Sequence, residues 1–264
     1  MTNTSPLSQT SRPGTPARPR RLLITAGPTH EPIDSVRFIG NRSSGKLGIA
    51  IAQAAARRGD RVTLLLGPVG TETTALADTG VVTRRFRTSA DLQTLLVRHF
   101  RSCDLLIMAA AVADFRPKRP PAAGEKLKRS AQGLTLRLEP TPDLVAACAA
   151  ARRTRHPQQI VGFALEPASR LAWSAKEKLI RKRLNAVVAN PLETMDSDRI
   201  HATVYGFDDG RPTALAATGS RLAKAAFGPW LLRVIDQLPP HASPEGPISR
   251  PKGSSRRPVR PPAR

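Results

Sequence analysis

Short apolar runs of strand length alternate along this chain with stretches of helical pattern, and this alternation is the feature that most restricts its fold. Arg21–Ala26 (RLLITA) and Arg61–Leu66 (RVTLLL) are almost continuously apolar, as strands buried on both faces are. Strands separated by helices in this way are typical of a parallel sheet covered on both sides. We therefore predict an α/β fold with a doubly wound, mostly parallel, Rossmann-like sheet, whose ligands bind beyond the carboxyl ends of the strands.

The same patterns predict the remaining elements of the chain. Ser89 is the expected cap of the second helix, because a serine hydroxyl can accept a free N–H at a helix start. Leu134–Leu138 alternates as a strand with one wet face does. Further strands are predicted at Asp104–Ala110, Ile160–Leu165, Ala186–Ala189, Ala202–Tyr205 and Thr213–Ala216, and helices at Gly45–Arg58, Ser89–Phe100, Thr141–Arg152, Ser169–Lys182 and Leu222–Ile235.

The first strand–helix connection, residues 27–44, is unusually long, and long connections in compact domains are usually functional. It lacks G-x-G-x-x-G, but Gly40–Leu47 fits G-x-x-x-x-G-K. A true P-loop is disfavoured, because Leu47 stands where a hydroxyl is needed and no clear strand runs into Gly40. Two interpretations stay open: a serine cap followed by a solvated lysine, or a phosphate or carboxylate site at a helix start formed by Arg42, Ser43, Ser44, Gly45 and Lys46.

Three other stretches carry candidate ligand-binding residues, each with a plainer alternative. Ala109–Ala111 and Asp114 follow the third strand, where small side chains admit a ligand, although an aspartate there is more often a turn or a cap. The cationic run that contains Lys126 could contact a polyanion, although charge runs are usually solvated. Lys178 and Lys182 share one helix face at i and i+4, and solvation is again the commoner explanation.

The formal net charge of +22 suggests nucleic-acid binding, but its distribution weakens that interpretation. Residues 1–21 carry +4 and residues 239–264 carry +5, which leaves +13 on residues 22–238. The two ends also hold 12 of the 25 prolines, so we expect disordered tails at 1–20 and 239–264. A nucleic-acid-binding module would need stacking aromatic residues, and the chain has a single Tyr. A Rossmann-type reductase is disfavoured by the missing glycine fingerprint.

Cysteine, histidine and hydropathy narrow the class of protein further. Cys103 and Cys148 are too few for a disulfide framework, and the five histidines show no metal-ligand spacing. No apolar run approaches the roughly 20 residues of a membrane span, and residues 1–21 lack the apolar stretch of a signal peptide. We therefore expect a cytoplasmic protein without a metal site of its own. No Ser-His-Asp or Cys-His arrangement suggests a protein nucleophile.

Several stretches, taken in order, match the motifs of one known family. The first is Ile24–Gly59, which contains the specific block Asn-Arg-Ser-Ser-Gly-Lys. It is followed by Val62–Pro68, Ala109–Lys118, Glu125–Arg129, Thr141–Leu144, Val161–Glu166, the Lys178/Lys182 pair and Val187–Pro191. Over roughly residues 21–238 the chain thus resembles phosphopantothenoylcysteine synthetase, the ligase step of coenzyme A biosynthesis. The flavin-dependent decarboxylase domain that precedes this one in many bacterial members is absent, so a monofunctional form is expected.

The resemblance implies a ligase that joins 4′-phosphopantothenate to L-cysteine. Enzymes of this family activate the carboxylate with a nucleoside triphosphate, usually CTP in bacteria, and form an acyl-nucleotidylate (acyl-CMP) and pyrophosphate. The amine of cysteine then displaces CMP. Mg²⁺ accompanies the nucleotide, bound mostly through phosphates and water. The resemblance also implies a homodimer formed through a small sheet with flaps, small-molecule substrates as the main partners, no membrane, and nucleic-acid contacts that are at most weak ones of the tails.

The resemblance assigns residues by position. Two are catalytic: Asn41, whose amide would donate to the acyl oxygen of the intermediate, and Lys126, a flap lysine that engages the activated intermediate. Phosphopantothenate binding is assigned to Arg37 together with Asn41, Ser43, Ser44, Gly45 and Lys46. The nucleotide pocket is assigned to Ala109, Ala110, Ala111, Asp114, Lys126, Thr141, Pro142, Asp143, Leu144, Phe163, Lys178 and Lys182.

The chain departs from the family pattern at three positions. Thr141 and Asn185 replace the usual Asn and Asp of their motifs. Arg199 follows Ser197-Asp198 in an element whose usual Asn is missing. These departures concern base recognition and the C-terminal edge of the predicted sheet more than the chemistry.

Overall fold

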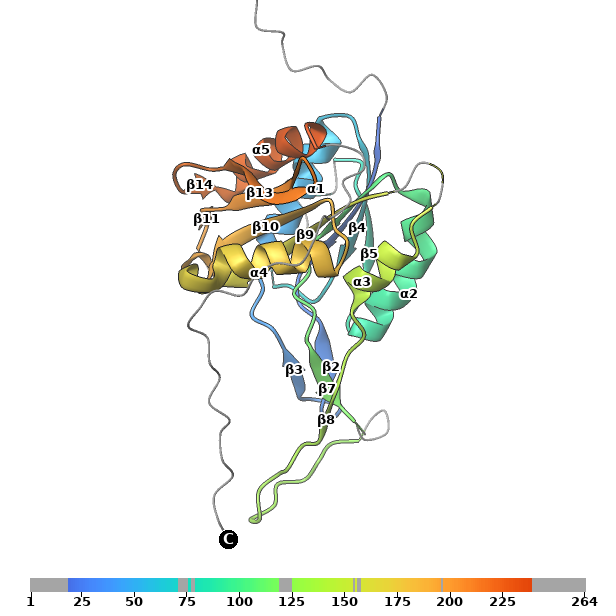
Figure 1. Cartoon of the computed structure of the whole chain (residues 1–264). Helices are drawn as coiled ribbons and strands as arrows, with labels where there is room; N and C mark the ends of the chain where they lie inside the picture. The colour runs from blue at the N-terminus through green and yellow to red at the C-terminus, as the bar shows by residue number, and fades with distance from the viewer. Residues whose placement is uncertain are drawn as a thin grey trace, which may run out of the picture.

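An eight-stranded sheet forms the centre of the protein in a computed structural model that describes residues 19–70, 76, 79–118, 125–153, 155, 158–195 and 197–238 (Figure 1). The tails predicted at 1–20 and 239–264 lie, apart from residues 19 and 20, outside the described residues. Six neighbouring strands are parallel and two antiparallel strands extend one edge, which confirms the predicted sheet. In spatial order the strands are β13 (Arg211–Ala217), β12 (Thr203–Asp208), β10 (Ala186–Pro191), β9 (Gln159–Glu166), β6 (Leu105–Met108), β1 (Arg21–Ala26), β4 (Arg61–Leu66) and β5 (Val82–Arg85).

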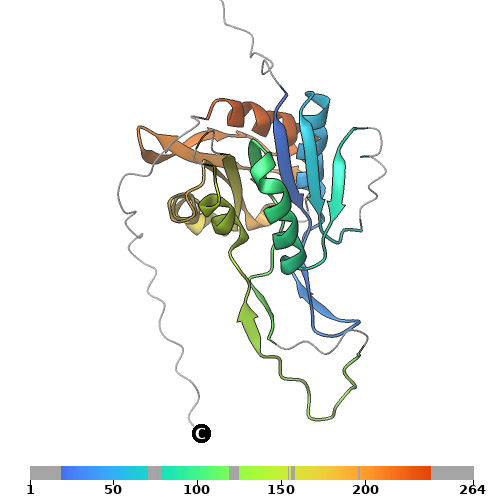
Figure 2. The same ribbon diagram turned by 90° about the vertical axis from the view of Figure 1, so that its right-hand side faces the viewer.

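Helices cover both faces of this sheet because successive residues of each strand point to opposite sides. On β1, Leu22 and Ile24 belong to the apolar cluster on one face, whereas Leu23 belongs to the cluster on the other. All three are almost fully buried. Figures 1 and 2 show the layers. The first face packs on α1 (Lys46–Arg57) and α5 (Lys224–Asp236), and the second on α2 (Ser89–His99), α3 (Leu144–Ala150) and α4 (Ala168–Arg181).

The chain reverses its direction of travel across the sheet between β1 and β6. After β1 it proceeds outward through β4 and β5, and it then returns to place β6 on the other side of β1. The loops that follow β1 and β6 therefore leave their strands in opposite directions and open a crevice at the carboxyl edge. In doubly wound folds, ligands bind at this position.

Two short antiparallel pairs project from that edge and form an arm of the molecule (Figures 1 and 2). The first pair, β2 (His30–Pro32) and β3 (Phe38–Gly40), lies within the long first connection. The second pairs β7 (Phe115–Pro117) with β8 (Leu138–Pro140). A third pair, β11 (Arg199–Ile200) with β14 (Leu222–Ala223), lies apart from the arm. None of the helices among the described residues combines the length and the apolarity needed to cross a membrane.

Several predicted boundaries are wrong for local reasons. The helix predicted from Leu222 begins only at Lys224, because Leu222 and Ala223 pair with β11 as a short strand. The strand predicted at Leu134–Leu138 begins only at Leu138, because β7 offers pairing partners to Leu138–Pro140 and the preceding residues are exposed. The helix predicted from Thr141 begins at Leu144, because the carboxylate of Asp143 caps it by accepting the N–H of Ala146.

The cap of α2 is Thr88 rather than Ser89. The Thr88 hydroxyl accepts the N–H of Asp91, and the Asp91 carboxylate accepts the N–H of Thr88, which completes a reciprocal capping box. Ser89 is fully buried, and its hydroxyl has no hydrogen-bond partner among the described residues.

Candidate functional site

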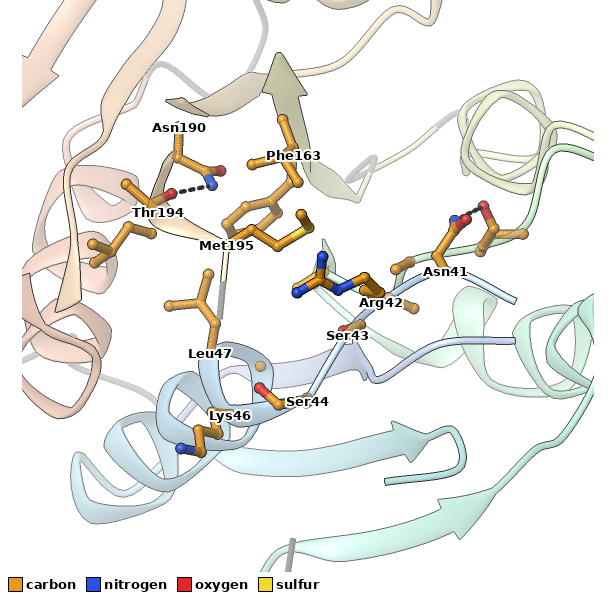
Figure 3. A pocket seen from close by; sticks show the side chains of 18 of the residues that line it. Asn41, Arg42, Ser43, Ser44, Lys46, Leu47, Phe163, Asn190, Thr194 and Met195 are labelled. Carbon is orange, nitrogen blue, oxygen red and sulfur yellow. Dashed lines mark hydrogen bonds between the residues drawn. The ribbon is translucent and has the colours of Figure 1, made fainter. Parts of the chain in front are cut away.

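A cavity of about 610 Å³ opens at the carboxyl edge of β1, β6, β9 and β10 (Figure 3). It lies at the crevice where the chain reverses across the sheet. Its lining comes from the start of α1 with the residues before it, the segment after β6, the middle of β9 with α4, and the end of β10 with the segment after it. β11 and α5 add one residue each. The predicted site residues that line it are Asn41, Ser43, Ser44, Gly45, Lys46, Ala109, Ala110, Ala111, Asp114, Phe163 and Lys178.

The long first connection leaves the sheet at Gly27 and returns at Gly45, and the two glycines lie against each other. Both have a left-handed backbone, with φ of 81° and 71°. A Cβ at either position would lie 2.9 Å from the side chain of Val69, and a Cβ on Gly45 would lie 3.4 Å from the Gly27 nitrogen. Only glycine combines this backbone with this spacing at low cost. The ends of residues 28–44 are thereby closed, and the arm that they contain begins and ends beside the cavity.

The start of α1 presents free backbone N–H groups to the cavity. Gly45 is the N-cap residue and supplies no side-chain cap, and the first turn contains no acidic residue. The first residues of a helix have no acceptor within the helix, so these N–H groups and the helix dipole favour an anion. Lys46 adds a cation, which is ion-paired at 2.7 Å with the exposed Asp198. Of the two interpretations of this stretch, the geometry favours the anion site.

A P-loop is not formed, although a strand does run into Gly40. The sequence pattern showed no strand there, whereas β3 ends at that residue. A P-loop, however, joins a strand of the parallel sheet to its helix. β3 instead belongs to an antiparallel pair outside the main sheet, and Leu47 occupies the hydroxyl position.

Asn41 faces the segment that follows β6. Its Nδ2 donates to the carbonyl oxygen of Val112 at 3.0 Å (Figure 3). An amide nitrogen carries two hydrogens, and among the described residues this is the only hydrogen bond of the Asn41 side chain. The bond therefore fixes the orientation of the amide and leaves a second N–H and the carbonyl oxygen for a ligand.

Two buried threonines hold the segment after β6 in place. The Thr25 hydroxyl accepts the N–H of Ala110 at 3.0 Å, and the Thr29 hydroxyl accepts the N–H of Ala113 at 3.0 Å. Both threonines are fully buried. They extend the β1–β6 pairing beyond the strands, so the small residues Ala109–Ala111 form a rigid wall of the cavity. Asp114 follows as an exposed carboxylate on the same lining.

Lys178 reaches the cavity from α4. It is partly buried, and its ammonium donates to the carbonyl oxygen of Phe163 on β9. Burial first, and the positive charge of Lys182 second, lower the pKa of Lys178 to about 8, against the opposing effect of Asp143. A buried cation with a lowered pKa is a common property of anion-binding sites. Lys178 thus brings a partly buried cation to the cavity, whose lining also contains Lys46 and Lys224.

Lys182 and its neighbours on α3 do not line the cavity. The Lys182 ammonium pairs with the Asp143 carboxylate at 2.9 Å, and this partner lowers the pKa of Asp143 against the effect of burial, which raises it. Thr141 donates its hydroxyl to the Ala113 carbonyl at 2.6 Å, so it supports the segment after β6 from behind. Pro142 and Leu144 lie on either side of Asp143. These predicted residues therefore lie outside the cavity lining, whereas Lys178 belongs to it.

Arg37 and Lys126 also lie outside the cavity lining, on the arm. Arg37 pairs with Asp34 within the turn between β2 and β3 and donates to the carbonyl oxygen of Leu127 at 2.9 Å. The side chain of Lys126 is exposed. The two predicted residues are thus brought together on the arm, since Arg37 is bonded to the neighbour of Lys126.

The sequence patterns missed a group of lining residues at the end of β10. Asn190 donates from Nδ2 to the hydroxyl of Thr194 at 3.0 Å, and that hydroxyl donates to the Pro191 carbonyl at 2.7 Å (Figure 3). The single hydroxyl hydrogen is thereby used, so Thr194 accepts from Asn190 and the amide oxygen of Asn190 stays available to a donor. A signal existed, because Asn190 follows a buried apolar strand at the ligand-binding edge. Met195, Ile200 and Lys224 complete this side.

Metal ligands are not clustered in the part of the chain that the structure describes. No group of three or more His, Cys, Asp or Glu side chains there is arranged to hold a metal ion. The two cysteines are free and buried, and burial raises the pKa of each thiol to about 12.

Comparisons with known proteins agree with this geometry. The chain is 43% identical over 188 residues to a cysteine/cysteine sulfinic acid decarboxylase of an unknown prokaryotic organism, covering 71% of this chain and 50% of that protein. It is 42% identical over 227 residues to the coenzyme A biosynthesis bifunctional protein CoaBC of Mycobacterium bovis, covering 83% of this chain and 52% of that protein. The chain thus spans about half the length of these curated relatives.

A solved structure covers nearly the same extent as this fold. It is the crystal structure of the C-terminal domain of a coenzyme A biosynthesis bifunctional protein CoaBC, with 31% identity and a TM-score of 0.64, covering 82% of this chain and 94% of that one. The family described as DNA/pantothenate metabolism flavoprotein C-terminal domain matches residues 17–227. From that match, and from the cavity at the reversal of the sheet, we conclude that the chain belongs to the DNA/pantothenate metabolism flavoprotein C-terminal domain family.

Proposed function

We propose that this protein is a phosphopantothenate–cysteine ligase. The observation that carries the proposal is the convergence, on one cavity, of a helix start without acidic residues, the buried ammonium of Lys178 and the oriented amide of Asn41. The helix start and the ammonium can bind the phosphates of a triphosphate and of a phosphate monoester. The amide can donate to the oxygen on which charge develops in an acyl transfer. Kinship with the C-terminal half of CoaBC proteins of coenzyme A biosynthesis supports the same substrates.

In the first half-reaction, a carboxylate oxygen of 4′-phosphopantothenate attacks the α-phosphorus of the nucleotide. A new C–O–P linkage forms and the bond to the β-phosphate breaks, which releases pyrophosphate. Little covalent chemistry is required of the protein, so positioning and cationic stabilisation carry the rate. Lys178 and the α1 N-terminus hold phosphates. We propose CTP as the nucleotide and Mg²⁺ as the ion that enters with it, bound mainly by phosphates and water.

In the second half-reaction, the amine of cysteine attacks the acyl carbon. The C–N bond forms, the C–O bond to the nucleotide breaks, and CMP leaves while the ammonium proton is lost to solvent. Negative charge develops on the acyl oxygen in this step. The second N–H of Asn41 donates to that oxygen, with its direction fixed by the bond to Val112. Lys126 acts from the arm on the activated intermediate.

We propose that the arm joins two copies of the chain. Apolar side chains gather on it with large exposed fractions: Val36 (59%), Phe38 (45%), Phe115 (53%), Leu134 (56%) and Leu138 (45%). A second copy offers the same surface, so a two-fold contact would cover both patches. Size-exclusion chromatography with light scattering tests this, with Phe115→Asp expected to give monomers and Val97→Asp, at an exposed site on α2, to leave dimers. Monomeric wild-type protein would contradict it.

The ligase proposal is tested by pyrophosphate release from purified protein, 4′-phosphopantothenate, cysteine and Mg²⁺ with either CTP or ATP. We expect release with CTP, and formation of the amide product by mass spectrometry. Folded protein that releases pyrophosphate with neither nucleotide would overturn the proposal. One relative is named as a cysteine/cysteine sulfinic acid decarboxylase, so CO₂ release is measured as well. Release of CO₂ from cysteine without any nucleotide would indicate a decarboxylase instead of a ligase. We expect the enzyme to work in the cytoplasm, where its nucleotide is made.

A further inference from the structure

The turn between β2 and β3 contains a buried carboxylate that the proposed chemistry does not use. Asp34 is 4% exposed, whereas the residues that follow it in the turn are open to solvent. Its Oδ1 accepts the N–H groups of Val36 at 2.9 Å and of Arg37 at 2.8 Å. These two bonds close the turn, as an aspartate at the start of a turn commonly does.

The other oxygen of Asp34 connects the turn to a distant segment. Oδ2 accepts Nε of Arg37 at 2.9 Å and, at 3.1 Å, the N–H of Leu127, which is 93 residues away in sequence. Arg37 in turn donates to the carbonyl oxygen of Leu127 at 2.9 Å. Both backbone groups of Leu127 are thus bound by one ion pair, and Arg37 is the main cause that holds the pKa of Asp34 well below its usual range.

The turn also binds the segment on the other side of Lys126. The N–H of Ser35 donates to the carbonyl oxygen of Glu125 at 2.9 Å. Lys126 is therefore flanked by two residues whose backbones are hydrogen-bonded to residues 34–37. Its own side chain stays exposed and free of these contacts. The arrangement fixes the backbone at Lys126 and leaves its ammonium without a partner among the residues that the structure describes.

We propose that Asp34 is a positioning residue for Lys126: through Arg37 and Leu127 it fixes the backbone from which that lysine acts. The inference rests on the proposed ligase function for its kinetic consequences, but the hydrogen bonds can be tested without it. A residue of this kind affects how often Lys126 is in place, and a displacement of about 1 Å can cost about 100-fold in rate.

Asp34→Asn tests the roles of the two carboxylate oxygens separately. The amide oxygen can still accept from Val36 and Arg37, so the turn is kept. The amide NH₂ replaces Oδ2 and opposes three donors, two from Arg37 and one from Leu127. We expect kcat to fall about 10- to 100-fold while the nucleotide KM changes by less than about twofold. Equal losses in binding and turnover would indicate general damage and overturn the proposal.

Asp91→Asn is the matched control. Asp91 also accepts two backbone N–H groups, from Arg87 and Thr88, but at the start of α2 and with no bond to the arm. We expect this variant to have a lower melting temperature and wild-type turnover per folded molecule. If Asp91→Asn lowers kcat as much as Asp34→Asn does, the effect belongs to lost stability and the proposal is wrong.

Hydrogen exchange of the wild-type protein tests the connection without any activity. The Leu127 amide should exchange more slowly than that of Lys128, which donates no hydrogen bond among the described residues. In Asp34→Asn the Leu127 amide should exchange as fast as that of Lys128. Equal exchange of the two amides in the wild type overturns the inference even if the ligase proposal holds. Inactive wild-type protein with a protected Leu127 amide would contradict the ligase proposal alone.

Discussion

Asn41 donates a hydrogen bond from its side-chain amide to the carbonyl oxygen of Val112, 71 residues later in the chain, at 3.0 Å. This bond joins the loop that enters α1 to the segment that leaves β6. The two strands of the main sheet that precede these segments, β1 and β6, are neighbours. The amide is thereby held in one orientation at the cavity lining, and the proposed acyl transfer depends on that orientation.

Asn41→Ala should lower formation of the amide product by about 100- to 1,000-fold, the usual cost of removing one donor to a developing oxyanion. Asn41 is exposed, so the melting temperature should stay within about 1 °C of wild type. Pyrophosphate release and amide formation, measured separately, show which half-reaction is lost. Normal turnover of the variant would remove Asn41 from the mechanism.

Lys126→Gln should lower turnover and leave nucleotide binding intact, because Lys126 lies on the arm and outside the cavity lining. Nucleotide affinity by calorimetry and kcat by pyrophosphate release give the two quantities. A matched variant is Lys128→Gln, an exposed lysine two residues away, which should behave as wild type. Equal loss of binding and turnover in Lys126→Gln would indicate a general phosphate-binding role.

Lys178 should make nucleotide binding fall at alkaline pH. Its pKa is about 8 because burial disfavours the ammonium, so above pH 8 the free enzyme loses the charge that meets the phosphates. We expect kcat/KM for the nucleotide to fall about tenfold per pH unit above that value. If kcat/KM of the wild type for the nucleotide does not fall above pH 8, the proposed role of Lys178 is contradicted.

Lys178→Met should stabilise the fold while it weakens nucleotide binding. An unfolded lysine has a pKa near 10.5, so below pH 8 both states carry the proton and the full cost of the buried charge is present. Between pH 8 and 10.5 the folded state releases its proton first, and the cost disappears. The gain in melting temperature should therefore be largest at pH 7 and shrink above pH 8. Thermal melts of the wild type and of Lys178→Met at pH 7 and at pH 10 measure this gain at the two pH values.

Gly48→Ala should destabilise the protein by about 1–3 kcal/mol, the usual cost of overpacking. A Cβ there would lie 2.5 Å from the Cβ of Ala26 and 3.1 Å from the carbonyl oxygen of Thr25, so α1 would have to move off β1. Gly70→Ala is the control, since no atom of the described residues lies within 4 Å of a Cβ at that position. Urea unfolding compares the two, and equal free energies of unfolding would show that the contact relaxes without cost.

Thr88→Ala and Ser89→Ala should differ although the residues are adjacent. Removing the Thr88 hydroxyl breaks the capping box and costs about 1 kcal/mol in the free energy of unfolding. Removing the Ser89 hydroxyl deletes a buried group without a partner among the described residues, so stability should be unchanged or higher. Urea unfolding of the two variants decides between these caps. A larger loss in the free energy of unfolding for Ser89→Ala would support Ser89 as the cap, as the sequence predicted.

The main sheet could be predicted because its signals are local. A continuous apolar run such as that of β1 must be buried on both faces, whatever the rest of the chain does. The arm could not be placed in this way. Strands β7 and β8 have three residues each, and the few hydrogen bonds between them are decided by a partner more than twenty residues away. The strand predicted from Leu134 therefore began in the wrong place.

The same difference between local signals and distant contacts applies to the candidate site. Ser43–Lys46 could be predicted as a candidate anion site at the cavity, because a helix start exposes N–H groups wherever it lies. The spacing of Lys178 and Lys182 predicts a shared helix face, and it says nothing of Asp143, which pairs with Lys182 from another helix.

By itself, the sequence determined the parallel sheet, the carboxyl edge at which the cavity lies and the family, because periodic burial and a helix start are properties of neighbouring residues. Only the tertiary structure decided that Lys178 and not Lys182 faces the cavity, that Asn190 joins the lining, and that Asp34 holds the backbone beside Lys126. Those outcomes depend on contacts between residues far apart in the chain, and burial and pairing at such contacts determine the charge and the direction of each side chain.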